Sequence, residues 1–298
     1  MSKKVMVIIN PSSGKEKAGE ILPNVEKVLG DIYEQVVVRK TKGEGDASRF
    51  AKEACEGKYD AVISMGGDGT VNETVNGLAE QEHRPILGII PLGTVNDFAR
   101  ALNIPLDPIK AMEMYTKSAV KEADIGKINN RYFMNVLAVG AIAEATYNVS
   151  VEQKTRLGSL SYFLEGAKTL VKKTPFPITV EHDHGRWTGE TYLLFATMTN
   201  SVGGFEQLAP EAEVNDGKLH IFIIKDLSLP LLVKIIPSLL RGEIKHHDEI
   251  EYIQTSRLHV STSEDLGVNI DGEKGVQMPF QAAVLHKHLR LFVPEHPE

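Results

Sequence analysis

The stretch from Met65 to Glu73 concentrates residue types that bind phosphate. It reads Met-Gly-Gly-Asp-Gly-Thr-Val-Asn-Glu, so three glycines, a carboxylate, a hydroxyl and an amide lie within a few positions. Glycine lets the backbone bend sharply and come close to a ligand. A carboxylate beside bound phosphates is repulsive unless a cation such as Mg²⁺ lies between them. The stretch therefore indicates a site for a nucleotide phosphate together with its metal.

The flanking segments place these glycines at a turn from a strand to a helix. Residues 59–64 form an apolar run that predicts a strand, and residues 71–79 predict a helix. A helix N-terminus points N–H groups and the positive end of its dipole at an anion. The stretch is not a Walker loop, because no Gly-Lys-Ser/Thr follows at the required spacing. It also lacks the Rossmann glycine pattern, in which an acidic ribose partner follows a second strand.

The first 125 residues alternate strand and helix patterns, which is typical of a parallel sheet covered by helices. We expect strands at residues 5–10, 33–39, 61–65 and 86–91, and helices at residues 18–29, 46–56, 71–79 and 95–102. Ligands of open α/β sheets bind at the carboxyl ends of the strands. Three of these ends carry loops rich in glycine and polar residues, at residues 10–15, 66–70 and 91–97.

The rest of the chain has strands in succession, at residues 126–137, 178–182, 188–199, 219–224, 251–254, 257–261, 268–270 and 282–292, with helical inserts at 157–170 and 230–240. Such a run of strands favours an antiparallel sandwich. The predicted fold class is α/β. A Rossmann-like parallel-sheet domain at residues 1–125 precedes a mainly antiparallel β-sandwich at 126–288, and residues 289–298 return to the first domain. The active site is expected in the interdomain cleft.

Composition narrows the functional classes. The net charge of -7 over 298 residues argues against a nucleic-acid partner, which usually requires a basic face. The single cysteine, Cys55, excludes an intramolecular disulfide and fits a reducing cytoplasm. The apolar run before Asn10 is too short for a signal peptide. No run reaches the roughly 20 apolar residues that span a bilayer, so we expect a cytoplasmic protein.

A second loop, from Pro91 to Arg100, again brings together a glycine, a hydroxyl, an amide and a carboxylate after a strand. By itself, Asn96-Asp97 could be an ordinary helix cap. Together the two loops resemble the diacylglycerol kinase catalytic family, lipid kinases that include bacterial diacylglycerol kinases and eukaryotic diacylglycerol, sphingosine and ceramide kinases. The similarity extends along nearly the whole chain in five ordered motifs: Asn10-Pro11-x-x-Gly14, Gly66-Gly67-Asp68-Gly69-Thr70-x-Asn72-Glu73, Pro91-x-Gly93-Thr94-x-Asn96-Asp97, Asp216-Gly217 and Asn269-Ile270-Asp271-Gly272-Glu273.

This resemblance implies roles for individual residues. ATP would be bound by Asn10, Ser12, Gly14, Thr41, Gly66, Gly67, Gly69, Thr70, Asn72 and Thr94. Asp68 would organise the catalytic Mg²⁺ and the phosphates, and a supporting network of water and metal would include Asp97, Asp124 and Asp271. Glu273 would be the general base. A second, structural Mg²⁺ would be held by Asp216 with the carbonyls of Glu213 and Lys218.

The chemistry of phosphoryl transfer agrees with these roles. A lipid hydroxyl is a poor nucleophile at neutral pH, so transfer benefits from a carboxylate that accepts its proton while metal and N–H groups align the phosphates. Taken alone, the Asp271-Gly272 segment would be read as a solvated hairpin turn. Its occurrence with the other motifs favours Glu273 as the base.

The acceptor is expected to be a lipid alcohol, with diacylglycerol as the leading candidate and a sphingoid base, a polyprenol or a phosphatidylglycerol-like lipid as alternatives. Residues 135–144 depart from the Gly-Phe-Asp-type sequence of many relatives where the acceptor would approach. A lipid substrate also implies transient docking at the inner face of the membrane, with plausible contacts from Lys15, Lys17, Lys168, Lys172 and Lys173. The resemblance further suggests a homodimer.

Two rival functions share part of this pattern. An NAD kinase also carries the Gly-Gly-Asp-Gly-Thr loop, but the second loop and the Asp271-Gly272-Glu273 turn resemble the lipid kinases. A regulator that binds nucleotide or lipid without turnover would have no need to keep Asp68, Asp97, Asp271 and Glu273 together. The histidines at 182, 184, 246 and 247 lie in polar stretches and are read as solvated turns rather than as metal ligands.

Overall fold

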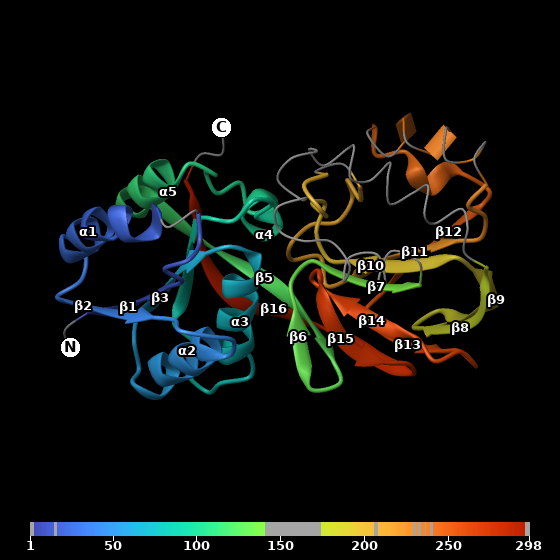
Figure 1. Ribbon diagram of the computed structural model, residues 1–298, viewed down its shortest axis with the longest axis horizontal. Coiled ribbons are helices and arrows are strands. Elements are labelled where there is room, and N and C mark those ends of the chain that lie inside the picture. Colours follow the sequence, from blue (N-terminus) through green and yellow to red (C-terminus); the bar gives the residue numbers. More distant parts are fainter. Residues whose placement is uncertain are drawn as a thin grey trace. The chain divides into compact units, whose positions relative to one another are not determined.

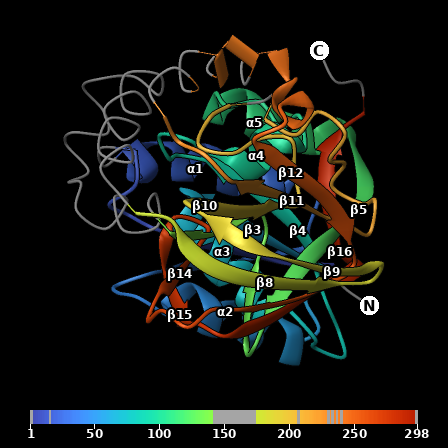
Figure 2. The same ribbon diagram turned by 90° about the vertical axis from the view of Figure 1, so that its right-hand side faces the viewer.

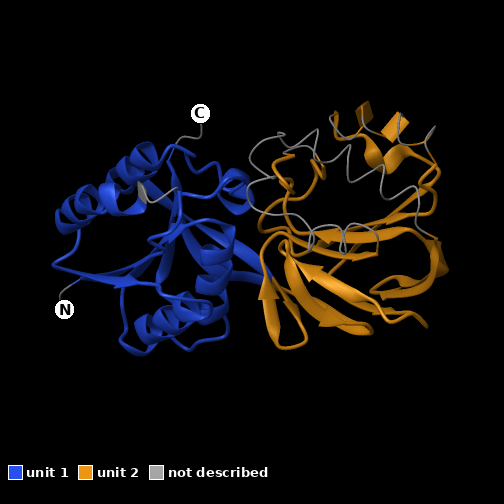
Figure 3. Cartoon of the chain, in the orientation of Figure 1, with its two compact units in different colours: residues 1–125, 286–298 blue, residues 126–285 orange. Residues whose placement is uncertain are grey.

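The computed structural model describes residues 3–14, 17–140, 174–205, 208–228, 231, 234–235, 237–238 and 241–295 of the chain. The chain forms two compact units: unit 1 comprises residues 1–125 and 286–298, and unit 2 comprises residues 126–285 (Figure 3). The chain passes from one unit to the other within β5 (Ser118–Ile128) and again within β16 (Phe280–Pro294). Its return to unit 1 therefore begins at His286.

Unit 1 contains the expected parallel sheet. Its strands β1 (Lys4–Ile9), β2 (Gln35–Lys40), β3 (Ala61–Gly66) and β4 (Ile86–Pro91) are parallel in the order β2-β1-β3-β4. The end of β16 pairs in parallel with β4 through Leu291 and Leu87. All six residues of β3 are buried, as expected for a strand with both faces covered.

Helices cover both faces of this sheet. Figure 1 shows α1 (Lys17–Gly30) and α5 (Pro108–Met114) on one face and α2 (Asp46–Glu56) and α3 (Asp68–Leu78) on the other, with the short α4 (Asp97–Ala101) after the second loop. Close packing of α2 on α3 depends on Gly77, because a Cβ there would lie 2.2 Å from the Ser48 carbonyl oxygen. The sequence prediction missed α5, although the N-cap Asp107 and Pro108 are a standard helix start.

Unit 2 is a sandwich of antiparallel strands, as expected. One sheet has the order β12-β11-β10-β7-β14-β15, and the strands are β7 (Val136–Gly140), β10 (Leu193–Thr197), β11 (Leu219–Ile224), β12 (Ile250–Thr255), β14 (Gly267–Ile270) and β15 (Glu273–Gln277). The other layer contains β6 (Arg131–Phe133), β8 (Phe176–His182), β9 (Gly185–Thr191), β13 (Arg257–Ser261) and the start of β16. The long β8–β9 hairpin can be followed in Figure 2.

The core of unit 2 lies between these layers. Buried side chains from one sheet, such as Leu194 and Ile221, belong to the same cluster as Val180, Leu258 and Phe280 from the other. The strand expected at residues 126–137 is interrupted, because Asn129 adopts a positive φ of 49° and the chain turns back into β6. The strand expected at residues 188–199 is likewise divided between β9 and β10.

Several predicted features fall outside the described residues. These are the helix at 157–170, residues 141–144, Lys15, Lys168, Lys172, Lys173 and the side chain of Lys17; the helix at 230–240 is described only in part. Among the residues that are described, no helix is long and apolar enough to cross a membrane.

Candidate active site

The loops after β1 and β3 meet at the point where the strand order of unit 1 reverses. In the order β2-β1-β3-β4, β1 and β3 are neighbours whose connections lead away in opposite directions, and open α/β sheets bind ligands at such a point. The Asn10 N–H donates to the Met65 carbonyl at 3.0 Å, and Asn10 Nδ2 donates to Thr70 Oγ1 at 3.4 Å. The first and second motifs are thus linked through one side chain.

The loop after β1 is folded around the same asparagine. Asn10 Oδ1 accepts hydrogen bonds from the N–H and the hydroxyl of Ser12, at 3.1 and 2.8 Å. Gly14 follows with a φ of +65°, a conformation that favours glycine. The next strand end adds Thr41, whose N–H donates to the Ile9 carbonyl at 2.9 Å. The structure therefore places four predicted ATP-site residues on adjoining loops.

The glycines of the second motif make room for close contacts. A Cβ at Gly66 would lie 2.5 Å from Thr70 Oγ1, and one at Gly67 would lie 3.2 Å from the Gly93 Cα. Gly67 precedes α3, and Asp68 is the first helical residue. Gly69 is exposed and Thr70 is buried. The backbone of this turn is thus packed against the loop that contains Gly93.

Asn96 joins the second and third motifs. Its backbone has a φ of +57°, and its N–H donates to Asp68 Oδ2 at 2.8 Å. Its amide side chain closes the loop on Gly93, accepting from the Gly93 N–H and donating to the Gly93 carbonyl, both at 2.9 Å. Asn96 is the N-cap of α4 by position, but its side chain does not cap the helix. It fixes the loop against Asp68 instead.

Sequence reasoning left Asn96 and Gly93 out of the predicted site. Both belong to the Pro91–Asp97 motif, from which only Thr94 and Asp97 were selected. Thr94 is exposed and Asp97 is half-buried, whereas Asn96 is only 7% exposed. The sequence signal that could have identified it is an asparagine that follows a glycine by three positions and directly precedes a helix.

Two further acidic side chains of unit 1 bind backbone amides. Asp124 is buried, and its Oδ1 lies 2.5 Å from the backbone nitrogen of Lys287 and 3.0 Å from His286 Nδ1. The carboxylate of Glu73 accepts from the Ala47 N–H at 3.1 Å, at the N-terminus of α2. Asp124 therefore fastens β5 to β16, while Glu73 connects α3 to α2.

Asn72, the remaining residue of the predicted ATP set, is half-buried on α3. It accepts from Asn76 Nδ2 through both its side-chain oxygen, at 3.0 Å, and its carbonyl, at 2.9 Å. These contacts order the first turns of α3 beyond Asp68.

In unit 2, Asp271 and Gly272 form the tight turn between β14 and β15. Their φ values are +49° and +88°, and Ile270 pairs directly with Glu273, which makes a two-residue hairpin of the type favoured by Asp-Gly. The turn is anchored by the Asp271 carboxylate, which accepts from the N–H groups of Met134, Asn135 and Val136 at 2.8, 2.9 and 2.9 Å. Glu273 is exposed at the start of β15.

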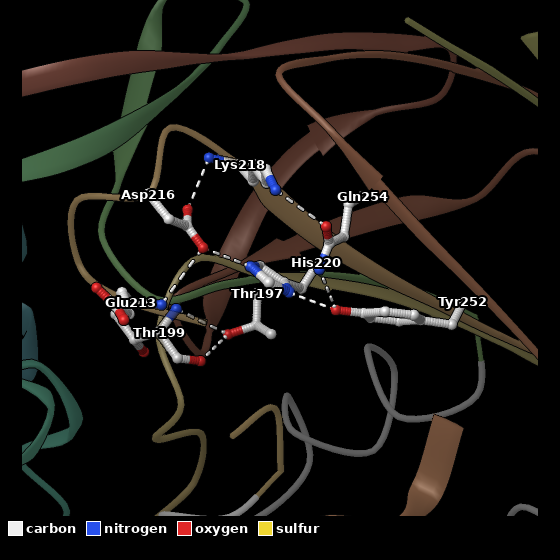
Figure 4. Close-up of polar contacts among 8 residues, drawn as sticks. All are labelled: Thr197, Thr199, Glu213, Asp216, Lys218, His220, Tyr252 and Gln254. Carbon is white, nitrogen blue, oxygen red and sulfur yellow. Dashed lines mark hydrogen bonds and ion pairs between the residues drawn. The ribbon is translucent and has the colours of Figure 1, made fainter. Parts of the chain in front are cut away.

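The Asp216 turn precedes β11 in the same unit (Figure 4). Asp216 Oδ1 accepts from the Lys218 N–H at 2.8 Å, and Oδ2 lies 2.8 Å from His220 Nε2 and 3.4 Å from the Glu213 nitrogen. The Glu213 carbonyl in turn accepts from the Asp216 N–H at 3.3 Å. A carboxylate and backbone carbonyls in one turn are hard oxygen donors, which is the donor chemistry that Mg²⁺ prefers.

Family models match both halves of the chain. The model for a "Diacylglycerol kinase catalytic domain" matches residues 4–128, and that for a "YegS C-terminal NAD kinase beta sandwich-like domain" matches residues 135–293. A protein of Bacillus subtilis (strain 168) named "Diacylglycerol kinase" is 39% identical over 294 residues, covering 98% of this chain and 97% of the relative. One of the same name from Staphylococcus epidermidis (strain RP62A) is 37% identical over 295 residues, covering 99% and 93%.

Solved structures are similar as well. A crystal structure of a diacylglycerol kinase from Bacillus anthracis strain Sterne has a TM-score of 0.85 and 30% sequence identity, covering 99% of this chain and 98% of that chain. Another crystal structure from that organism has a TM-score of 0.88 and 31% identity, covering 99% and 96%. Similarity at this level extends over both units.

Proposed function

The chain belongs to the diacylglycerol kinase family, and we propose that it transfers the γ-phosphoryl group of ATP to the hydroxyl of diacylglycerol, which yields phosphatidic acid. The observation that carries this proposal is the joining of three phosphate-type motifs through Asn10, Asp68 and Asn96 where the strand order of unit 1 reverses. Family membership also implies ATP as co-substrate and a divalent cation, which we take to be Mg²⁺.

Unit 1 would bind the nucleotide. The N–H groups at the start of α3 suit the phosphates, since an eleven-residue helix presents unsatisfied donors and a positive dipole end there. The Asp68 carboxylate at that terminus supplies the oxygen ligands that Mg²⁺ prefers. A bound Mg²⁺ would neutralise charge on the phosphates. Asn96 would hold Asp68 in place through the hydrogen bond from its backbone N–H.

Unit 2 would supply the general base. Glu273 would accept the proton of the lipid hydroxyl while the hydroxyl oxygen forms a bond to the γ-phosphorus of ATP. The bond from that phosphorus to the oxygen bridging it to the β-phosphate would break, and ADP would leave. The hairpin turn beside Glu273 is fixed by Asp271, so the base is carried on rigid backbone. Asp216 and the carbonyls of Glu213 and Lys218 would hold the structural Mg²⁺ in this unit.

A kinase assay with Glu273→Gln tests the assignment. The purified chain would be incubated with labelled ATP and mixed micelles of diacylglycerol. We expect the substitution to lower kcat by about 10²–10⁴-fold, because general base catalysis contributes that much. Glu264→Gln, an exposed carboxylate of the same unit, is the matched control and should keep wild-type turnover. Near wild-type turnover in Glu273→Gln would contradict the base assignment.

The acceptor needs a separate assay. Labelled product from total extracted lipid, identified by mass spectrometry, should be phosphatidic acid, and NAD should not be phosphorylated. A phosphorylated sphingoid base or polyprenol would overturn the acceptor but keep the lipid kinase. ATP binding without any product would instead support a regulator.

A bilayer substrate also leads us to propose transient docking on the cytoplasmic face of the membrane, and a homodimer. Sedimentation with vesicles that contain or lack anionic lipid tests the docking, and equal binding to both would count against an electrostatic contribution. Light scattering on the purified chain would give the mass of the assembly.

A further inference from the structure

We propose that Lys218, Gln254, Tyr252 and His220 form one directional hydrogen-bond chain that fixes the orientation of Asp216 and thereby sets the affinity of its turn for a divalent cation. These four side chains are positioning residues, since they act through Asp216. The inference rests on the proposed function, in which Asp216 is a cation ligand, and it adds the network that holds this ligand.

The chain of contacts is continuous (Figure 4). Lys218 Nζ donates to Gln254 Oε1 at 3.1 Å, and Gln254 Nε2 donates to the Tyr252 hydroxyl at 2.9 Å. That hydroxyl lies 2.6 Å from His220 Nδ1, and His220 Nε2 lies 2.8 Å from Asp216 Oδ2. His220 and Gln254 are directly paired across β11 and β12, so the backbone register brings these side chains together.

The two ends of the chain together fix its direction, because the Lys218 ammonium can only donate and the Asp216 carboxylate can only accept. An ammonium can only donate, so Gln254 must turn its carbonyl oxygen toward Lys218 and its amide nitrogen toward Tyr252. The Tyr252 oxygen accepts from that nitrogen and has its own hydrogen left to give to His220 Nδ1. Burial raises the pKa of Tyr252, which keeps this hydrogen on the phenol.

The histidine passes this direction on to the carboxylate. The Asp216 carboxylate accepts from His220 Nε2, so a neutral His220 carries its hydrogen there and its Nδ1 is left to accept from Tyr252. His220 is fully buried, so its ring has little room to rotate to other hydrogen-bond partners. A network of satisfied hydrogen bonds around one fully buried histidine favours a single geometry.

Both carboxylate oxygens of Asp216 are thereby held. Oδ2 accepts a hydrogen bond from His220 Nε2, and Oδ1 accepts one from the Lys218 N–H in the turn itself. A fixed carboxylate can present its remaining lone pairs to a cation at a lower entropic cost. Residues that orient a metal ligand in this way typically change affinity by about 10–100-fold when they are substituted.

The test is a titration of the full chain with Mg²⁺ or Mn²⁺ after treatment with EDTA, followed by thermal unfolding. Asp216→Asn defines the part of the cation-dependent rise in Tm that belongs to this turn. We expect Tyr252→Phe to weaken that part by about 10-fold or more in apparent Kd. Lys218→Met, which keeps the backbone N–H and carbonyl of the turn, should weaken it in the same direction. Tyr132→Phe, elsewhere in unit 2, is the matched control and should have no effect.

A spectroscopic readout tests the direction of the chain independently of cation binding. Long-range ¹H–¹⁵N correlation spectra of ¹⁵N-histidine-labelled protein distinguish a hydrogen on Nε2 from one on Nδ1. We expect His220 to carry the Nε2 hydrogen in the wild type and to lose this single pattern in Tyr252→Phe. A hydrogen on Nδ1 in the wild type would overturn the proposed direction.

The outcomes separate this inference from the proposed function. If Asp216→Asn abolishes the cation response while both Tyr252→Phe and Lys218→Met leave the apparent Kd unchanged, the cation site stands and the positioning chain is wrong. If Asp216→Asn leaves the response unchanged, the cation site itself is wrong and the inference fails with it. A lower Tm in EDTA alone, with unchanged apparent Kd, reports a purely structural role and also overturns the inference.

Discussion

Asp68 and Asp271 both lie beside glycines at a strand end, but their surroundings differ. Asp68 opens α3 and accepts a hydrogen bond from Asn96 on a separate loop. Asp271 lies in a hairpin turn, and its two oxygens accept from three backbone N–H groups at the start of β7 and just before it. Motif similarity alone gave both a part in phosphate and metal chemistry. The contacts favour a chemical role for Asp68 and an anchoring role for Asp271.

The sharpest test of this difference is Asp68→Asn. The amide keeps an oxygen that can accept from the Asn96 N–H, so the loop contact survives while the charge is lost. We expect turnover to fall by about 10²–10³-fold, the cost of removing one preorganised electrostatic group at a reacting centre. Tm should stay near the wild-type value. Asp31→Asn, on the exposed surface of unit 1, should change neither quantity. Loss of fold instead of turnover would reverse the roles inferred for the two aspartates.

A smaller effect is expected when the loop that holds Asp68 is displaced. In Gly93→Ala, the added methyl would lie 2.6 Å from Asn96 Oδ1 and 2.8 Å from the Gly67 Cα, so the two loops must separate. Misplacement by about 1 Å can cost up to about 10²-fold in rate, and we expect a loss below that limit with a raised KM for ATP. Gly19→Ala is the control, because nothing lies within 4 Å of the new Cβ. Unchanged kinetics in Gly93→Ala would show that the Gly67–Gly93 contact does not position the site.

We expect Asp271→Asn to lower the free energy of unfolding more clearly than it lowers turnover. Whichever way the amide is turned, its NH₂ group faces at least one N–H donor that the carboxylate accepted. Leaving such a donor without an acceptor costs about 1–3 kcal/mol in the free energy of unfolding. Urea unfolding measures that cost, and a kinase assay under native conditions should show a smaller loss than Asp68→Asn. The comparison fails if turnover collapses while stability is unchanged.

The elements that could be predicted from the sequence are those with a clear apolar pattern. The predicted bounds of α2, Asp46–Glu56, match the observed ones because its buried residues form one helical face. Those of β4, Ile86–Pro91, match because the strand is a continuous apolar run that is buried at five of its six positions. β15 was missed because none of its residues is fully buried and its pairing with β14 contains a register shift. A strand of this kind has no alternation of apolar and polar residues for the sequence to reveal.

The site was predictable to the level of motifs but not of contacts. The glycines around Asp68 predict a phosphate-binding turn, since this prediction needs only the local spacing of residues. The donors to Asp271 come from residues more than 130 positions earlier, and those to Asp124 from the other end of the chain. For these two carboxylates the pairing of distant strands decides which backbone amides they meet, so a single sequence cannot separate an anchoring aspartate from a chemical one.

The smallest effect on turnover is expected for a third carboxylate, that of Asp183, which lies in none of the five motifs. Hydrogen bonds from the hydroxyl and N–H of Ser256, both at 2.7 Å, hold the pKa of Asp183 well below its ordinary value, with further donors on Thr255 and Arg257. A folded pKa below the unfolded value of about 3.9 means that ionised Asp183 stabilises unit 2 above that pH, and that this stabilisation is lost as the pH falls toward the folded pKa.

Asp183→Asn should therefore be less stable than the wild type at pH 7, with a difference in unfolding free energy that stays constant down to about pH 5 and narrows below about pH 4. Urea unfolding at several pH values measures this difference. A difference in unfolding free energy that does not change with pH would mean that the charge of Asp183 contributes nothing to stability. Turnover should be unchanged, because Asp183 belongs to none of the motifs of the candidate site. If the difference in unfolding free energy between the wild type and Asp271→Asn also narrows at low pH, Asp183 and Asp271 have the same anchoring role. Asp68 then differs from both in its chemistry, although it shares a motif type with Asp271.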